Sequence, residues 1–142
     1  KYFKKELFFT DVEGKTKDEV LKNLCRKVEQ EKGLPETFTA SVLKREELTP
    51  TDYGNLVALP HPERAFQERA FVAVAVLKEP IFWFRQKVQV VFLTAIGREE
   101  DENLQQFYEA TTDLILRPAD VQNLIRHPDY DRLIQLLRRA EE

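Results

Sequence analysis

Two long apolar runs follow one another in the middle of the chain and constrain its fold more than any other feature. Ala70 to Leu77 and Val88 to Ile96 are rich in β-branched and aromatic side chains and lack the polar alternation of a half-exposed strand. Such runs are typical of central strands that are covered on both faces. Between them, Glu79 and Pro80 predict the beginning of a turn.

Shorter segments predict two further strands. Leu7 to Phe9 is apolar and ends at polar residues and a glycine, and Leu56 to Leu59 is stopped by two prolines. The stretch from Thr49 to Asn55 is so rich in turn-forming residues that we expect a loop there.

Helical periodicity occurs on both sides of these strands. Thr16 and Glu19 have capping-box spacing at the start of a helix that Gly33 closes, and a second helix is expected from Glu36 to about Leu48. The last third predicts three more helices, over residues 104–115, 118–125 and from Asp129 onward.

Helices at both ends and strands between them predict an α/β protein. We expect a three-layer α/β/α sandwich in which a mixed central sheet carries helices on both faces. The 142 residues contain no repeat or linker, which predicts one domain over residues 1–142. Because the chain has no methionine, not even at position 1, we expect a fragment of a larger protein, or a chain whose initiator was removed.

Composition excludes several classes of protein. Twenty-two Lys and Arg against 25 Asp and Glu give a net charge of −3, so no basic field attracts nucleic acid or anionic lipid. No apolar run approaches the roughly 20 residues of a membrane span. The single cysteine, Cys25, cannot form an internal disulfide. We expect a soluble, cytoplasmic protein.

Two histidines are present, and their surroundings differ. His61 follows an apolar strand and stands between Pro60 and Pro62, which hold it on a stiff loop at a strand end. Strand ends of α/β sheets often carry ligand chemistry, although a lone histidine there can also be a loop residue without a chemical role. His127 precedes a proline between two helical segments, where an exposed helix end explains it.

Other chemistries lack the residues that they require. Cys25 lies on an apolar helix face and is interpreted as a buried hydrophobe, and Ser41, the only serine, has no nucleophile-elbow pattern. The acidic run from Glu99 to Glu102 has no nearby histidine, and the four glycines are isolated. We expect no metal and no cofactor.

Arg45-Glu46, Thr51, Gly54-Asn55, Ala58 and Pro60-His61 follow one another in the segment that ends in His61. This pattern resembles the active-site segment of enzyme IIA domains of the fructose and mannitol class in the bacterial sugar phosphotransferase system (PTS). Arg45 precedes His61 by 16 residues, as in that family, although alone it is also compatible with a solvated surface charge. The Gly54-Asn55 pair and the later segments Glu79 to Trp83 and Val88 to Leu93 are more similar to the subgroup fused to transcriptional regulators with phosphotransferase regulation domains (PRDs). The resemblance covers residues from about Phe3 to Leu137.

The resemblance implies that His61 accepts a phosphoryl group from the phosphocarrier protein HPr and passes it to a IIB protein or domain. It implies that Arg45 clamps the phosphoryl oxygens, and that Thr51, Asn55 and Asn103 support the site. Asn103 stands where family members that relay phosphate rapidly carry a second histidine. This difference favours a domain whose phosphorylation is a signal.

Three functions therefore compete. The first is a regulatory IIA-like domain that works with the other domains of a PRD-containing regulator, an activator or antiterminator, and does not itself contact nucleic acid. The second is a catalytic IIA component of sugar transport, a phosphocarrier-type phosphotransferase. The third is a degenerate domain that only binds a partner protein, through an exposed aromatic segment from Phe82 to Phe84.

Overall fold

The computed structural model describes residues 2–99 and 101–141. The chain divides into two compact units, Lys1–Glu99 and Glu100–Glu142. Glu100, which belongs to the acidic run noted above, lies outside the described residues.

The first unit contains a five-stranded mixed sheet with two helices. In chain order the elements are β1 (Phe3–Phe9), α1 (Lys17–Lys32), α2 (Thr37–Leu48), β2 (Asp52–Gly54), β3 (Val57–Ala58), β4 (Phe71–Phe82) and β5 (Lys87–Ala95). The strand order is β1-β4-β5-β3-β2. Strand β4 is parallel to β1 and antiparallel to β5, and β3 is parallel to β5 and antiparallel to β2. The predicted α/β class with a mixed sheet is confirmed.

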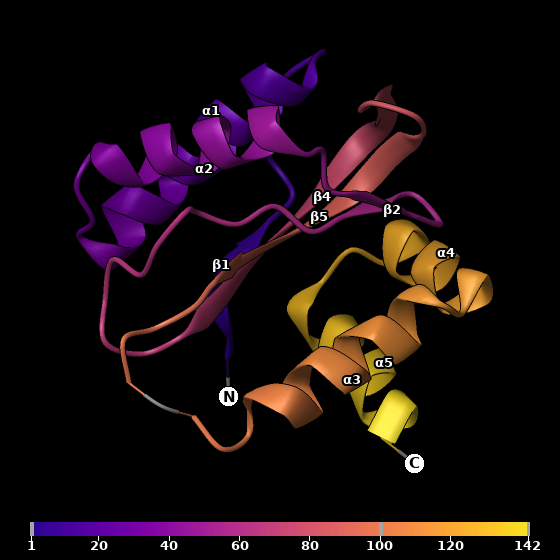
Figure 1. The fold of residues 1–142 in the computed structure, drawn as a ribbon. Coiled ribbons are helices and arrows are strands. Elements are labelled where there is room, and N and C mark those ends of the chain that lie inside the picture. Colours follow the sequence, from indigo (N-terminus) through magenta and orange to yellow (C-terminus); the bar gives the residue numbers. More distant parts are fainter. Residues whose placement is uncertain (1, 100, 142) are drawn as a thin grey trace. The chain divides into compact units, whose positions relative to one another are not determined.

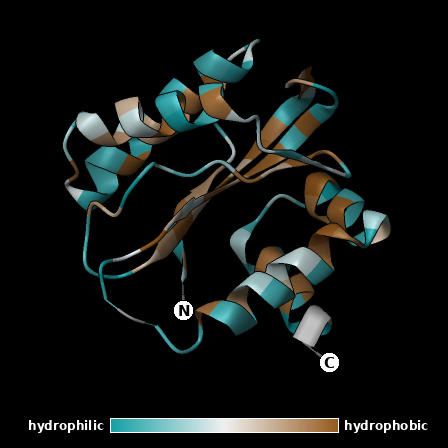
Figure 2. Cartoon of the chain, viewed as in Figure 1, coloured by the Kyte–Doolittle hydropathy of each residue, from teal (hydrophilic) through white to brown (hydrophobic). Residues whose placement is uncertain are grey.

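Helices α1 and α2 lie side by side on one face of this sheet (Figure 1). Hydrophilic and hydrophobic residues alternate around both helices (Figure 2), as expected for helices with one buried side. The Thr16 hydroxyl accepts from Glu19 N at 3.2 Å, so the predicted cap is confirmed. Phe38 of α2 packs against Phe71 of β4 with ring centroids 6.2 Å apart, which joins α2 to the sheet.

Two local predictions were wrong. Strand β4 continues through Glu79 and Pro80 to Phe82. Proline is tolerated there because the β4–β5 register shifts between Val76 and Ile81, where its missing N–H interrupts no regular ladder. Residues Asp52–Gly54 form the short edge strand β2 although their composition is that of a loop. An edge strand of this length needs only a few backbone bonds to one neighbour.

The second unit contains α3 (Leu104–Ile115), α4 (Pro118–Arg126) and α5 (Tyr130–Glu141), so the three predicted helices are confirmed. Pro118 occupies the first turn of α4, as its fixed φ predicts. Asp120 is 5% exposed, and its carboxylate lies 3.1 Å from Arg117 Nε and 3.2 Å from Arg139 Nη1. This carboxylate thus joins α4 to α5.

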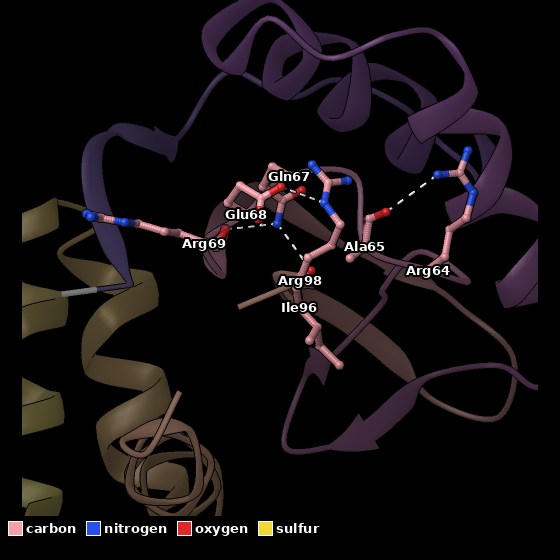
Figure 3. Close-up of polar contacts among 7 residues, drawn as sticks. All are labelled: Arg64, Ala65, Gln67, Glu68, Arg69, Ile96 and Arg98. Carbon is pink, nitrogen blue, oxygen red and sulfur yellow. Dashed lines mark hydrogen bonds and ion pairs between the residues drawn. The ribbon is translucent and has the colours of Figure 1, made fainter. Parts of the chain in front are cut away.

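Residues 67–69, in the loop that leads into β4, lie against the segment that leaves β5 (Figure 3). Glu68 Oε1 accepts from Arg98 Nε at 2.7 Å, and Gln67 Nε2 donates to the Ile96 carbonyl at 3.2 Å. Backbone amides of Arg98 and Glu99 donate to the carbonyls of Gln67 and Glu68. A Cβ atom on Gly97 would meet the Glu68 carbonyl oxygen and lie 2.6 Å from Ala70 N. Only glycine permits this approach of two backbones.

Gly97→Ala is therefore expected to lower the free energy of unfolding by about 1–3 kcal/mol, because the new methyl group overpacks against backbone that cannot rotate away. The free energy of unfolding is measured in urea, with tryptophan fluorescence as the signal. Gly33→Asn is the matched control, since a Cβ at Gly33 meets nothing within 4 Å and asparagine tolerates its φ of +65°. Equal losses in the two variants would contradict the steric explanation.

Candidate functional site

His61 lies in the loop that follows β3, after Leu59 and Pro60, at the end of the sheet where the parallel strands β3 and β5 both finish. The carbonyl of Pro60 accepts a hydrogen bond from Thr94 N at 3.0 Å. This bond fixes the residue before His61 to the end of β5. The histidine is half-buried, whereas Pro62 is buried. The predicted stiff loop at a strand end is present.

Helix α2 holds the loop on the other side of His61. Ser41, 7% exposed on the inner face of α2, accepts a hydrogen bond from Glu63 N at 2.7 Å. Backbone bonds on one side and this side-chain bond on the other leave His61 little freedom to move. The sequence pattern assigned Ser41 only to a helix, so its contact with the loop was not predicted.

The His61 ring has a defined orientation. Nδ1 lies 3.3 Å from the carbonyl oxygen of Leu59. Because a carbonyl oxygen can only accept, this contact is a hydrogen bond in the tautomer that carries its proton on Nδ1. The lone pair of the neutral ring is then on Nε2, the nitrogen that can attack an electrophile.

Arg45 lies in the last turn of α2, half-buried, and its Nη1 donates to the Thr49 carbonyl at 3.1 Å. Within the described part of the chain it forms no hydrogen bond to His61. A guanidinium has five N–H donors in a planar fork, so the bond to Thr49 leaves most of them for an anion. The structure thus orients Arg45 through the segment after α2.

Thr51 is bound to a buried carboxylate. Its backbone N and its hydroxyl donate to Glu46 at 2.6 and 2.7 Å, and its carbonyl accepts from Leu59 N at 3.0 Å. Thr51 therefore connects α2 to the residue whose carbonyl orients the His61 ring. In the sequence Glu46 belongs to the charged run from Lys44 to Glu47, which is typical of a solvated helix face, but in the structure it is only 2% exposed.

Asn55 belongs to the tight turn between β2 and β3. Gly54, Asn55 and Leu56 have φ values of 134°, 53° and 69°. Asparagine is among the residues that best tolerate the left-handed region, which accounts for its place in this turn. Its predicted support of the phosphoryl site stays a prediction.

Asn103 and His127 belong to the second unit. Asn103 is exposed at the N-cap of α3, where its side chain forms no capping hydrogen bond. His127 is exposed at the C-cap of α4, and its backbone N donates to Asn123 O at 2.9 Å. The prediction that His127 marks a helix end is confirmed.

The aromatic segment from Phe82 to Phe84, which begins at the last residue of β4, is only partly exposed. Phe82 and Phe84 are 63% and 49% exposed, as predicted, but Trp83 is 4% exposed, so its predicted exposure was wrong. The indole Nε1 of Trp83 donates to Glu46 at 2.9 Å, which draws the ring inward. No sequence pattern indicated a contact between residues so far apart in the chain.

Cys25 does not provide a second nucleophile. Burial raises the pKa of the Cys25 thiol, and the nearby Glu29 carboxylate raises it further by a smaller amount. This cysteine therefore stays protonated and unreactive.

Within residues 2–99 and 101–141, no three His, Cys, Asp or Glu side chains gather where they could hold a metal ion. No helix in the described chain has the length and apolar character needed to cross a bilayer.

Known relatives match most of the chain. The probable licABCH operon regulator of Bacillus subtilis (strain 168) is 37% identical over 133 residues, which are 94% of this chain and 21% of that protein. Transcriptional regulator ManR of the same organism is 27% identical over 120 residues, 84% of this chain and 18% of that protein. The chain thus spans about a fifth of the length of these two relatives.

A solved structure has the same fold. The complex of enzyme IIAMTL and phosphorylated enzyme IIBMTL from Escherichia coli matches with a TM-score of 0.77 and 18% identity, covering 95% of this chain and 97% of that chain. The family described as phosphoenolpyruvate-dependent sugar phosphotransferase system, EIIA 2, matches residues 1–140. The chain belongs to this family of EIIA 2 domains.

Proposed function

We propose that this domain accepts a phosphoryl group on Nε2 of His61 and that the modification regulates a transcriptional regulator of which the domain is one part. The donor is HPr or a IIB partner, as in the phosphotransferase system to which the family belongs. The domain acts in the cytoplasm on other domains of the parent regulator, and it neither contacts nucleic acid nor inserts into a membrane.

The orientation of the His61 ring is the observation that carries this proposal. Nδ1–H donates to Leu59 O, so Nε2 has the lone pair. Nucleophilic attack by Nε2 on the phosphorus forms the N–P bond of a phosphoramidate. The bond between phosphorus and the donor atom, a histidine nitrogen in HPr, breaks, and its electron pair stays on that atom. The Leu59 carbonyl then stabilises the positive charge that the phosphorylated ring of His61 acquires.

Arg45 provides charge for the transfer. Phosphoryl transfer requires positioning and charge stabilisation more than covalent help from the protein. The guanidinium fork can hold two equatorial oxygens at once, which an ammonium group cannot do. Its bond to the Thr49 carbonyl limits the directions in which the fork can point. Thr51 does not contact the phosphoryl group in this proposal. It supports the site through its hydrogen bond to Glu46, the neighbour of Arg45 in α2.

The regulatory role is preferred over a transport role because regulators are the curated relatives with 37% and 27% identity. The lack of a second histidine at Asn103 agrees with this preference. A domain that only binds a partner is the third possibility, and the exposure of Phe82 and Phe84 is the observation in its favour. Uptake of phosphate separates it from the other two, because a pure binding domain takes up none.

His61→Ala is expected to abolish phosphate incorporation from phosphorylated HPr while the fold is kept, because a half-buried loop side chain contributes little to stability. Phosphate uptake is measured with radiolabelled phosphoenolpyruvate, enzyme I and HPr, and ¹⁵N NMR of the wild type should place the phosphate on Nε2. His127→Ala is the control and should incorporate as much as the wild type. Phosphorylation that persists in His61→Ala and is lost in His127→Ala would contradict the assignment.

Arg45→Ala is expected to slow phosphorylation by a large factor, on the order of 10³ by analogy with other arginine clamps. Arg45→Lys should recover only part of the rate, because the ammonium makes a single contact where the guanidinium makes two. Single-turnover rates with phosphorylated HPr measure both effects. Unchanged rates in both variants would return Arg45 to the class of surface charges.

Asn103→His is expected to speed phosphoryl exchange with HPr, because an imidazole can carry a proton near pH 7 and a carboxamide cannot. The expectation depends on the resemblance that places the second histidine of rapid carriers at this position. The comparison is between single-turnover rates of the wild type and the variant with the same donor. Equal rates, with His61 phosphorylated in both, would remove this argument for a regulatory role.

A further inference from the structure

Glu46 is a buried carboxylate without a cationic partner. It is 2% exposed, and among the described residues no Lys, Arg or His forms an ion pair with it. Burial of a charge is costly unless hydrogen bonds replace the lost water. Three bonds do so here: Oε2 accepts from Thr51 N and Trp83 Nε1, and Oε1 accepts from the Thr51 hydroxyl. So specific a set of donors fixes the carboxylate in one position.

The position of Glu46 sets the direction of Arg45. Both residues lie in the last turn of α2, where neighbouring side chains diverge by about 100° around the helix axis. Because the Glu46 side chain is anchored in the interior, the last turn cannot rotate, and the Arg45 side chain is held toward the surface segment that begins at Thr49.

The same carboxylate sets the position of the His61 ring. The carbonyl of Thr51 accepts from Leu59 N at 3.0 Å, and the carbonyl of Leu59 lies 3.3 Å from His61 Nδ1. One side chain is thereby connected to both groups that the proposed transfer needs, the guanidinium in α2 and the imidazole after β3.

Trp83 anchors this arrangement to the sheet. Its ring is buried in the hydrophobic core, and its indole N–H reaches Glu46 at 2.9 Å from the turn between β4 and β5. Nearby, Asp52 Oδ2 accepts from the backbone N of Arg85 and of Gln86 at 2.9 and 3.1 Å, so β2 is tied to the same turn. The turn therefore holds the whole segment between α2 and β3.

We infer that Glu46 is a positioning residue for phosphoryl transfer at His61 and that the indole N–H of Trp83 holds it in place. The inference rests on the proposed function. Glu46 touches neither the phosphoryl group nor the reacting nitrogen. It acts by keeping Arg45 and His61 in a fixed geometry.

Trp83→Phe tests the inference most directly, because it removes the N–H donor and keeps an aromatic ring in the core. We expect single-turnover phosphorylation by phosphorylated HPr to slow by about tenfold, since small misplacements of transfer groups are costly. Glu46→Gln should keep most of the rate, because its amide oxygen can accept from both N–H donors while its NH₂ donates to the Thr51 hydroxyl. Glu46→Ala should lose at least as much rate as Trp83→Phe.

The double variant Glu46→Ala/Trp83→Phe should be no slower than Glu46→Ala alone, because both changes break the same connection. Glu47→Gln, at an exposed carboxylate in the same helical turn, is the matched control and should leave the rate unchanged. All rates are expressed per folded molecule, with the folded fraction taken from urea unfolding of each variant followed by circular dichroism, because Trp83 is the only tryptophan. If Glu46→Ala does not fold, the rates of Trp83→Phe and Glu46→Gln decide whether Glu46 positions the transfer groups.

Two failures can be distinguished. If wild-type protein takes up no phosphate at His61, the proposed function fails and this inference fails with it. If the wild type is phosphorylated at His61 but Trp83→Phe lowers only the free energy of unfolding and leaves the rate per folded molecule unchanged, Glu46 is a structural residue alone. In that case the inference is overturned while the proposed function stands.

Discussion

A carboxylate removed from water must find donors, and the requirement of Glu46 for donors organises one end of the first unit. The donors come from the segment after α2 and from the turn between β4 and β5, which are distant in sequence. The hydrogen bonds from these donors to Glu46 hold the backbone from the end of α2 to the start of β3 in one conformation. Arg45, Thr51 and His61, the residues of the proposed transfer that lie in the first unit, are all connected to this segment, and the packing of α1 and α2 on the sheet supports it.

Elements whose signals lie within a few residues of one another could be predicted from the sequence. The Thr16 cap, the helix over residues 104–115 and the two central strands follow from spacing and side-chain type within a few residues. The extent of β4 could not, because Pro80 signals a turn locally and only the register shift against β5 makes it acceptable. The edge strand β2 likewise exists through its partner and not through its own composition.

In the candidate site, too, some residues could be predicted from the sequence and others could not. His61 and Arg45 could be singled out from the two prolines, the spacing and the family resemblance. The residues that fix them could not, since Ser41, Glu46 and Trp83 act across separations of 22, 5 and 37 residues in their hydrogen bonds. A single serine on an apolar helix face was the one available signal for such a contact. A glutamate within a charged run gives no sign that it is buried.

The loop around His61 has a thermodynamic consequence for any protein that docks there. Pro60 and Pro62 restrict the backbone, and the bonds to Thr94 and Ser41 hold both flanks before a partner arrives. Docking at this loop therefore loses little backbone conformational entropy, and less of the free energy of contact is spent on ordering it. A loop that is ordered in advance thus reduces the contact area that recognition of the His61 region requires.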